Sequence, residues 1–194
     1  MHDDKVRVIA IAGSLRRGSF NRLALRAAET LGPADMSFDT FDIAGIPIFN
    51  ADDEVTPPEI VADFKRRIRA ADAVLIATPE YNYSIPGGLK NAIDWASRPY
   101  GDSAWKGKPV AIFGASTGMF GSARAQYHLR QCFVFLDMYP VNQPEVMLAK
   151  AAQRFDAQGQ LTDETTKKLL RQLLEALAAL TRTLRAGRSA LAPS

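Results

Sequence analysis

The sequence predicts an α/β fold in which a parallel sheet is covered by helices on both faces. Apolar, strand-like runs alternate with helical segments about five times along the chain, the pattern of a parallel sheet with crossover helices. Two of these runs, residues 73–78 and 110–114, are continuously apolar, as strands buried on both faces are. The chain has 194 residues, of which 47% are hydrophobic and 23% charged, which suits one domain with one core region.

The first third of the chain predicts two strands and one helix. Residues 6–12 alternate Val, Ile and Ala around one Arg and predict a first strand, which Gly13 ends. Residues 20–31 carry apolar side chains every four positions and predict a helix. Residues 37–43 alternate weakly, which favours an edge strand, and a polar loop follows at residues 51–55.

The middle of the chain predicts a helix, a buried strand and a second helix. Thr56 is expected to cap the first of these helices, with Pro57 at its first helical position and Glu59 completing a capping box. The buried strand covers residues 73–78, and the second helix covers residues 86–97.

The last part of the chain completes the pattern. Residues 110–114 predict another buried strand, and residues 120–136 predict a helix. A last short strand is expected within residues 139–148, followed by a long helix over residues 163–186 with a leucine stripe. Residues 1–186 then form a single domain, and residues 187–194 are expected to be a flexible tail.

Five strands alternating with helices favour a flavodoxin-like three-layer sandwich with a five-stranded parallel sheet in the order 2-1-3-4-5. In such sheets, ligands bind beyond the carboxyl ends of the strands, beside the first strand, where the strand order reverses. The loops after the first, third and fourth strands are therefore the candidate binding loops.

Composition and charge exclude several classes of protein. The net charge is +3 and the sequence pI is near 9.1, but the basic residues are mixed with nearly as many acids, which argues against nucleic-acid binding. No apolar run approaches the roughly 20 residues of a membrane helix, and the N-terminus does not resemble a secretory signal, so a cytoplasmic protein is expected. The lone Cys132 is expected to be buried and inert. With only His2 and His128 available, we expect no metal site and nominate no catalytic residue.

The loop after the first strand, residues 13–21, is rich in glycines, hydroxyls and arginines at a predicted helix N-terminus. Free N–H groups and the helix dipole attract an anion there, and Ser14, Ser19, Asn21 and Arg16 can add side-chain hydrogen bonds. An ordinary helix cap is the alternative. The spacing lacks the Gly-Lys-Ser/Thr of a nucleotide-binding P-loop and the three glycines of a dinucleotide fingerprint, so a phosphomonoester, as in FMN, is the predicted ligand.

The loop after the third strand, residues 78–91, contains two tyrosines, an amide and a Pro-Gly-Gly turn. The tyrosine side chains can pack against a flat ring, and the Asn82 amide can both donate hydrogen bonds to and accept them from the ring edge. A tyrosine-rich subunit interface is the alternative, and the two are compatible. In the loop after the fourth strand, residues 114–122, Ser116 and the N–H groups near Thr117 are expected at the pyrimidine edge of the flavin.

These loops together make the sequence resemble the NADPH-dependent FMN reductase family, in particular its flavin-dependent quinone and chromate reductases. The resemblance covers residues 5–180 and rests on Gly13-Ser14-Leu15-Arg16, Ser19-Phe20-Asn21, Pro79-Glu80-Tyr81-Asn82-Tyr83-Ser84, Leu89-Lys90-Asn91-Ala92-Ile93-Asp94-Trp95 and residues 122–131. It implies that the phosphate is held by Ser14, Arg16, Ser19, Phe20 and Asn21. It implies that the ring and its side chain are held by Pro79, Glu80, Tyr81, Asn82 and Ser116. It also implies a homodimer or homotetramer.

The expected activity is therefore an oxidoreductase that contains FMN, takes hydride from NADPH or NADH and reduces small acceptors by ping-pong transfer. Quinones, azo compounds, chromate and free flavin are the candidate acceptors, and the loops do not separate them. A flavodoxin-type electron carrier without nicotinamide turnover is the main alternative, although such carriers are typically acidic. A flavin-free binding module on the same fold is a further alternative.

Overall fold

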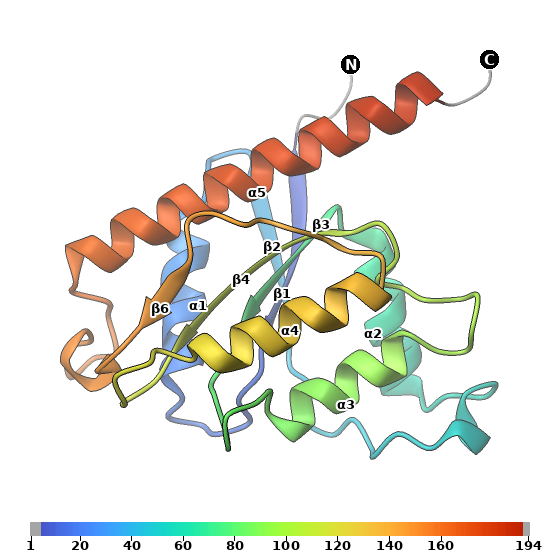
Figure 1. Ribbon diagram of the computed structural model, residues 1–194, viewed down its shortest axis with the longest axis horizontal. Helices are drawn as coiled ribbons and strands as arrows, with labels where there is room; N and C mark the ends of the chain where they lie inside the picture. Colours follow the sequence, from blue (N-terminus) through green and yellow to red (C-terminus); the bar gives the residue numbers. More distant parts are fainter. Residues whose placement is uncertain (1–4, 192–194) are drawn as a thin grey trace.

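The computed structural model describes residues 5–191, in which a parallel sheet lies between two layers of helices (Figure 1). The strands are β1 (Val6–Ala12), β2 (Met36–Phe41), β3 (Ala73–Ala77), β4 (Pro109–Ala115), β5 (Tyr139–Pro140) and β6 (Val146–Leu148). The α-helices are α1 (Phe20–Leu31), α2 (Glu59–Ala70), α3 (Gly87–Ala96), α4 (Ala123–Phe135) and α5 (Glu164–Leu191). The order β2-β1-β3-β4-β5 confirms the predicted flavodoxin-like topology.

The last position in the sheet differs from the single strand expected there. Both β5 and β6 pair with β4, β5 at Pro109 and Val110 and β6 from Phe113 to Ala115. The two short strands flank a segment that contains Pro144, and Pro140 ends β5. Because proline has no N–H to donate to a ladder, the chain leaves the sheet between them, and the described part of the sheet has six strands instead of five.

The predicted start of α2 is wrong. The helix begins at Glu59 and its N-cap position is Pro58, without a side-chain cap, so Thr56 and Pro57 do not form the expected capping box. The reason lies in the Pro57-Pro58 pair. The ring of Pro58 disfavours helical backbone at the residue before it, so Pro57 cannot be the first helical residue.

Two helix ends also shift from the prediction. Helix α4 begins at Ala123 because Gly121 and Ser122 adopt left-handed backbone, with φ of 54° and 73°. Helix α5 continues to Leu191, past the predicted end at residue 186, and its Arg188 guanidinium donates to the carbonyl of Gly107. The expected flexible tail therefore begins inside the helix, and residues 192–194 of that tail lie outside the described residues.

The sheet separates two apolar layers. Helices α1 and α5 pack on one face, over side chains such as Val8, Leu75 and Phe113. Helices α2, α3 and α4 pack on the other face, over Ile9, Ile76 and their neighbours. Among residues 5–191, no helix is long and apolar enough to cross a bilayer.

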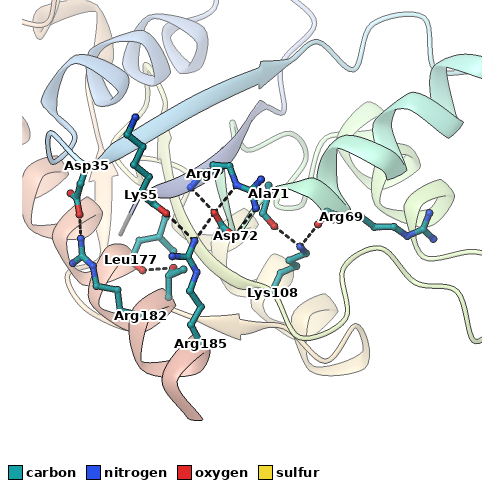
Figure 2. Close-up of polar contacts among 11 residues, drawn as sticks. Lys5, Arg7, Asp35, Arg69, Ala71, Asp72, Lys108, Leu177, Arg182 and Arg185 are labelled. Atoms are coloured by element: carbon teal, nitrogen blue, oxygen red, sulfur yellow. Dashed lines mark hydrogen bonds and ion pairs between the residues drawn. The ribbon is translucent and has the colours of Figure 1, made fainter. Parts of the chain in front are cut away.

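Charged side chains tie the amino end of the sheet to α5 (Figure 2). Asp72 accepts from the backbone and the Nε of Arg7 at 2.8 and 3.1 Å, and it forms an ion pair with Arg185 at 2.6 Å. Burial alone would raise the pKa of Asp72, but these bonds outweigh burial and lower it. Nearby, the Lys108 Nζ donates to the carbonyls of Arg69 and Ala71 at the end of α2. This end of the sheet is closed by paired charges.

Candidate functional site

At the opposite, carboxyl end of the sheet, three loops enclose a cavity of about 350 Å³. It lies beside β1, where the strand order reverses, as expected for this topology. Nine of the ten predicted binding residues line it: Ser14, Arg16, Ser19, Phe20, Asn21, Pro79, Glu80, Tyr81 and Ser116. The tenth, Asn82, lies in an exposed turn and does not line the cavity. The structure thus brings together residues that lie up to about 100 positions apart in the sequence.

The first loop, between β1 and α1, places hydroxyls and N–H groups at a helix N-terminus. Ser14 and Ser19 are both 2% exposed, and the Ser19 Oγ accepts from the backbone N–H of Asn21 at 3.2 Å. The other N–H groups of the first turn of α1 have no partner within the helix. Arg16 is exposed at the edge of the cavity, with its guanidinium 6.0 Å from the Phe20 ring centroid. These donors fit a phosphomonoester.

Arg22 supports this loop, and the sequence analysis did not identify it. Its Nε donates to the carbonyl of Ser14 at 3.1 Å, and its Nη2 forms an ion pair with Asp42 at 2.8 Å. Burial opposes ionisation of Asp42, but bonds from the Ala44 N–H and from Arg22 outweigh burial and lower the pKa of Asp42. In the sequence, Arg22 is an arginine in the first turn of a predicted helix. An arginine at such a position usually faces solvent, so nothing local marks its role in supporting the loop.

Asn21 lies in the wall of the cavity with its side chain already engaged. The residue is 3% exposed. Its Nδ2 donates to the carbonyl of Ala115 at 2.9 Å, and its Oδ1 accepts from the N–H of Ala115 at 2.9 Å. Both polar atoms of the amide therefore bind the backbone at the end of β4.

The second loop turns sharply after β3. Tyr81 and Ser84 exchange two backbone hydrogen bonds, of 3.1 and 2.9 Å. Between them, Asn82 and Tyr83 have φ of 50° and 66°, in the left-handed region that residues other than glycine seldom adopt. Such backbone persists only where its surroundings hold it in place. Here, helix α4 does so through contacts with Glu80, Tyr83 and Ser84.

Glu80 makes the principal contact between this loop and α4. Its side chain is 7% exposed, and its Oε1 accepts from the Nε of Arg124 at 2.5 Å while its Oε2 accepts from the Arg124 N–H at 2.9 Å. The Arg124 guanidinium also stacks on Tyr83, 3.6 Å from the ring centroid, and lies 4.6 Å from the Phe120 centroid. The hydrogen bond that the Arg124 guanidinium donates to the Glu80 carboxylate raises the pKa of Arg124. The Glu80 carboxylate therefore points at α4.

The third loop follows β4 and is held by β6. The backbone N–H of Ser116 donates to the carbonyl of Leu148 at 3.0 Å, and the Ser116 Oγ accepts from the N–H of Gly118 at 3.1 Å. Among the described residues, Thr117, which also lines the cavity, makes no hydrogen bond through its N–H. That donor remains for a ligand at this end of the cavity.

The described residues include no cluster of three or more His, Cys, Asp or Glu able to hold a metal ion. His128 lies exposed on α4, with its Nδ1 3.0 Å from the Ser84 Oγ, and does not line the cavity. Cys132 is half-buried, and burial raises the pKa of its thiol, which disfavours a nucleophilic thiolate. The cavity lining offers hydroxyl and N–H donors together with Phe20 and Tyr81, which suits a group that carries its own chemistry.

A flavodoxin-like sheet with free N–H groups at a helix N-terminus and a tyrosine-bearing loop at its carboxyl end is the arrangement of α/β proteins that bind a mononucleotide. Comparisons with known proteins agree with this class of fold and site. The family model for NADPH-dependent FMN reductases matches residues 6–153, and the chain belongs to that family.

Individual relatives resemble the chain over nearly its whole length. An NAD(P)H-dependent FMN reductase from Pseudomonas aeruginosa is 55% identical over 94% of this chain and 98% of its own. A 2-hydroxy-1,4-benzoquinone reductase from a Burkholderia species is 46% identical over 91% of this chain and 97% of its own. Among solved structures, the flavoenzyme FerB of Paracoccus denitrificans, an NAD(P)H:(acceptor) oxidoreductase, superimposes with a TM-score of 0.85 at 38% identity, over 92% and 98%.

Proposed function

We infer that the protein is an FMN-dependent oxidoreductase that takes electrons from NAD(P)H and reduces small acceptors such as quinones. The observation that carries this inference is the cavity at the carboxyl end of the sheet, where phosphate donors and a ring-binding loop meet in a member of the FMN reductase family. When bound, FMN supplies the redox chemistry by accepting hydride from the nicotinamide and passing electrons on. The protein itself binds the cofactor, orients it and shields it from water.

For the phosphate end, we propose the hydroxyls of Ser14 and Ser19, the guanidinium of Arg16 and the first N–H groups of α1. The two hydroxyls are buried at the cavity wall, where hydrogen bonds to an anion are screened little by solvent. Arg16 is exposed but lines the same cavity, so it can close over a bound phosphate with charge-assisted bonds. Phe20 lies beside it and limits the space for water.

For the ring end, we propose the backbone of Pro79, Glu80 and Tyr81 on one side and Ser116 with the Thr117 N–H on the other. All five line the cavity. Asn82 does not line the cavity, and we propose that it would reach the ring edge from the left-handed turn next to Tyr81. No acid or base is needed, because the protein only has to hold the ring and exclude water.

With FMN filling this cavity, donor and acceptor would use one face of the bound flavin in turn, which predicts ping-pong kinetics. The relatives are named for FMN, benzoquinone and quinones, so quinones are the first acceptors to test, followed by azo compounds, chromate and free flavin. The flavodoxin-type carrier is disfavoured because the relatives are NAD(P)H-dependent reductases and the net charge is +3.

We also propose that the protein acts as a homodimer or homotetramer in the cytoplasm. Helix α4 and the adjoining loops expose large apolar side chains, among them Tyr83 at 68%, Phe120 at 63%, Val134 at 83% and Phe135 at 75%. A monomer seldom leaves so many together, and a second copy would cover them. Light scattering after size exclusion tests this, and a monomer at micromolar concentration would contradict it.

Anaerobic mixing with nicotinamide tests the function. Protein saturated with FMN is expected to lose its visible flavin absorption on mixing with NADPH or NADH and to regain it on mixing with a quinone. Bound flavin that neither nicotinamide reduces would favour the electron carrier. No FMN binding by calorimetry would favour the flavin-free module.

Adjacent arginines provide a matched pair of variants for the site. Arg16→Ala is expected to weaken FMN binding by about tenfold or more, the value of a charge-assisted bond to phosphate. Arg17→Ala removes the same charge one residue away, outside the cavity, and is expected to have little effect. Equal losses would contradict the proposed phosphate end.

A further inference from the structure

The hydrogen-bond ladder between β3 and β4 ends where the cavity begins. Its last rungs are the Ala77–Phe113 pair and the bond from the Thr78 N–H to the Phe113 carbonyl, at 2.9 Å. In a continuing parallel ladder, the next donor would be the N–H of Glu80, bonding the carbonyl of Ala115. Instead, the chain leaves the sheet at Pro79 to form the second loop. The backbone groups of Ala115 that face β3 therefore lose their strand partner.

Asn21 fills this gap. Its amide both donates to and accepts from Ala115, at 2.9 Å in each direction, across 94 positions of sequence. A side-chain amide has the donor and acceptor geometry of a backbone amide, so it can replace the missing rung. At 3% exposure the bridge is sheltered from water, and removing it would leave a buried N–H and a buried carbonyl unpaired.

We propose that Asn21 is a positioning residue that fixes the first and third loops at the separation a flavin mononucleotide requires, and that its side chain is not a phosphate ligand. This rests on the proposed function. Asn21 follows Ser19 and Phe20 at the phosphate end, while Ala115 precedes Ser116 at the ring end, so one amide joins the two ends of the cavity.

The chemistry restricts the residue at this position. Aspartate retains the acceptor for the Ala115 N–H but places a carboxylate against the Ala115 carbonyl. Alanine removes both bonds, and glutamine is longer by one methylene. Asn21→Asp therefore changes hydrogen bonding with almost no change of shape, which makes it the sharpest substitution here.

Riboflavin, which is FMN without the phosphate, separates positioning from phosphate binding. A phosphate ligand affects only FMN, whereas a residue that sets the loop separation affects both flavins. We expect Asn21→Asp and Asn21→Ala to weaken binding of FMN and of riboflavin by similar factors, about tenfold or more. Arg16→Ala should weaken FMN alone. A loss confined to FMN in the Asn21 variants, or no loss with either flavin, would overturn the proposal.

Two controls keep the result interpretable. Ile68→Ala empties a fully buried position in α2, on the far face of the sheet, and is expected to lower stability while both flavin affinities stay unchanged. If it weakens flavin binding as much as Asn21→Ala does, the effect is general destabilisation and the positioning role fails. The second control needs no variant. In the flavin-free wild-type protein, the amide of Ala115 should exchange its hydrogen as slowly as its neighbours in β4, and fast exchange would refute the bridge.

These measurements also distinguish failure of the inference from failure of the proposed function. If wild-type protein binds neither flavin, the proposed function fails, while slow exchange at Ala115 would still support the bridge. If wild-type protein binds both flavins and the Asn21 variants bind them equally well, the function stands and the inference fails.

Discussion

The two ends of the sheet use polar side chains in opposite ways. At the amino end, Arg7, Asp72, Arg185 and Lys108 bind one another or nearby carbonyls, and α5 joins this group through Arg185 (Figure 2). At the carboxyl end, buried serines and N–H groups surround an open cavity, and Arg16 has no carboxylate partner among the described residues. The same strands carry both ends, so the difference comes from the loops.

This contrast separates residues that hold the protein together from residues that hold a ligand. Changes at the amino end should alter the free energy of unfolding and leave flavin affinity unchanged. Changes to the donors of the cavity should do the reverse. Gly114 and Arg124 do not line the cavity but lie next to its loops. Substituting them tests whether such residues affect mainly stability or mainly flavin binding.

The largest effect is expected at Gly114, which precedes the cavity-lining residue Ala115 in β4. A Cβ there would lie 1.9 Å from the Ser122 Oγ and 2.1 Å from the carbonyl oxygen of Thr78. Since the second contact is with backbone, the strand itself must shift, and we expect Gly114→Ala to cost about 3 kcal/mol or more. Urea unfolding measures the loss. Gly18→Ala, where the added Cβ meets nothing within 4 Å, is the control and should be nearly neutral for stability.

At the amino end, Asp72→Asn should lower the free energy of unfolding and spare flavin binding. It removes the counter-charge of Arg7 and Arg185. We expect a loss of about 1–2 kcal/mol, less than for a fully buried pair because Arg7 is largely solvent-exposed. Urea unfolding and FMN titration of the same preparation measure both quantities. A weakened FMN affinity would contradict the division between the two ends.

The pH dependence of the same pair follows from the lowered pKa of Asp72. A carboxyl whose pKa is lower in the folded than in the unfolded protein stabilises the fold above its unfolded pKa, near 3.8. That contribution is lost as the pH falls through the folded value. Wild type should therefore exceed Asp72→Asn in stability by its full margin at pH 7, and the margin should shrink below about pH 4. A margin that grows on acidification would contradict this assignment.

Replacing Arg124 should act on the ring-binding loop. Arg124→Ala removes the ion pair to Glu80 and the stacking on Tyr83, which together hold the left-handed turn. We expect about tenfold weaker FMN binding, and also a loss of stability because the buried Glu80 carboxylate is left without its counter-charge. Arg130→Ala, on the same helix and bonded to Val141 and Asn142, is the matched control and should bind FMN normally. Light scattering on both variants shows whether oligomeric state contributes.

The smallest effect is expected from Arg188→Ala. Its bond to the Gly107 carbonyl lies at the exposed end of α5, so we expect a loss of about 0.5 kcal/mol or less. Arg185→Ala, one turn earlier and paired with Asp72, should cost more. A larger loss of stability for Arg188→Ala than for Arg185→Ala in urea unfolding would mean that α5 is held mainly through its contact with Gly107 and not through Asp72.

The sequence predicted the elements whose signal is local. The apolar runs at residues 73–78 and 110–114 predict buried strands, and both lie in buried strands. The split of the last strand was missed because strands of two and three residues are too short to show a period. Helix α2 begins later than its capping pattern predicts because Pro58 sterically disfavours helical backbone at Pro57.

For the site, the composition of each loop indicated which residues meet at the cavity but not what each side chain binds. Asn21 was expected at the phosphate, yet its amide pairs with Ala115, 94 positions away. Glu80 was expected at the ring, yet its carboxylate pairs with Arg124, 44 positions away. Partners so distant in sequence are fixed by tertiary packing, which local patterns do not encode.

The divided strand at the outer border of the sheet has a consequence for solubility at high concentration. An uninterrupted border of free N–H and carbonyl groups invites strand addition by other molecules and so promotes fibre growth. Here β5 and β6 offer two and three residues, and Pro140 and Pro144 cannot donate. Strand addition by other molecules is thereby hindered at this border of the sheet.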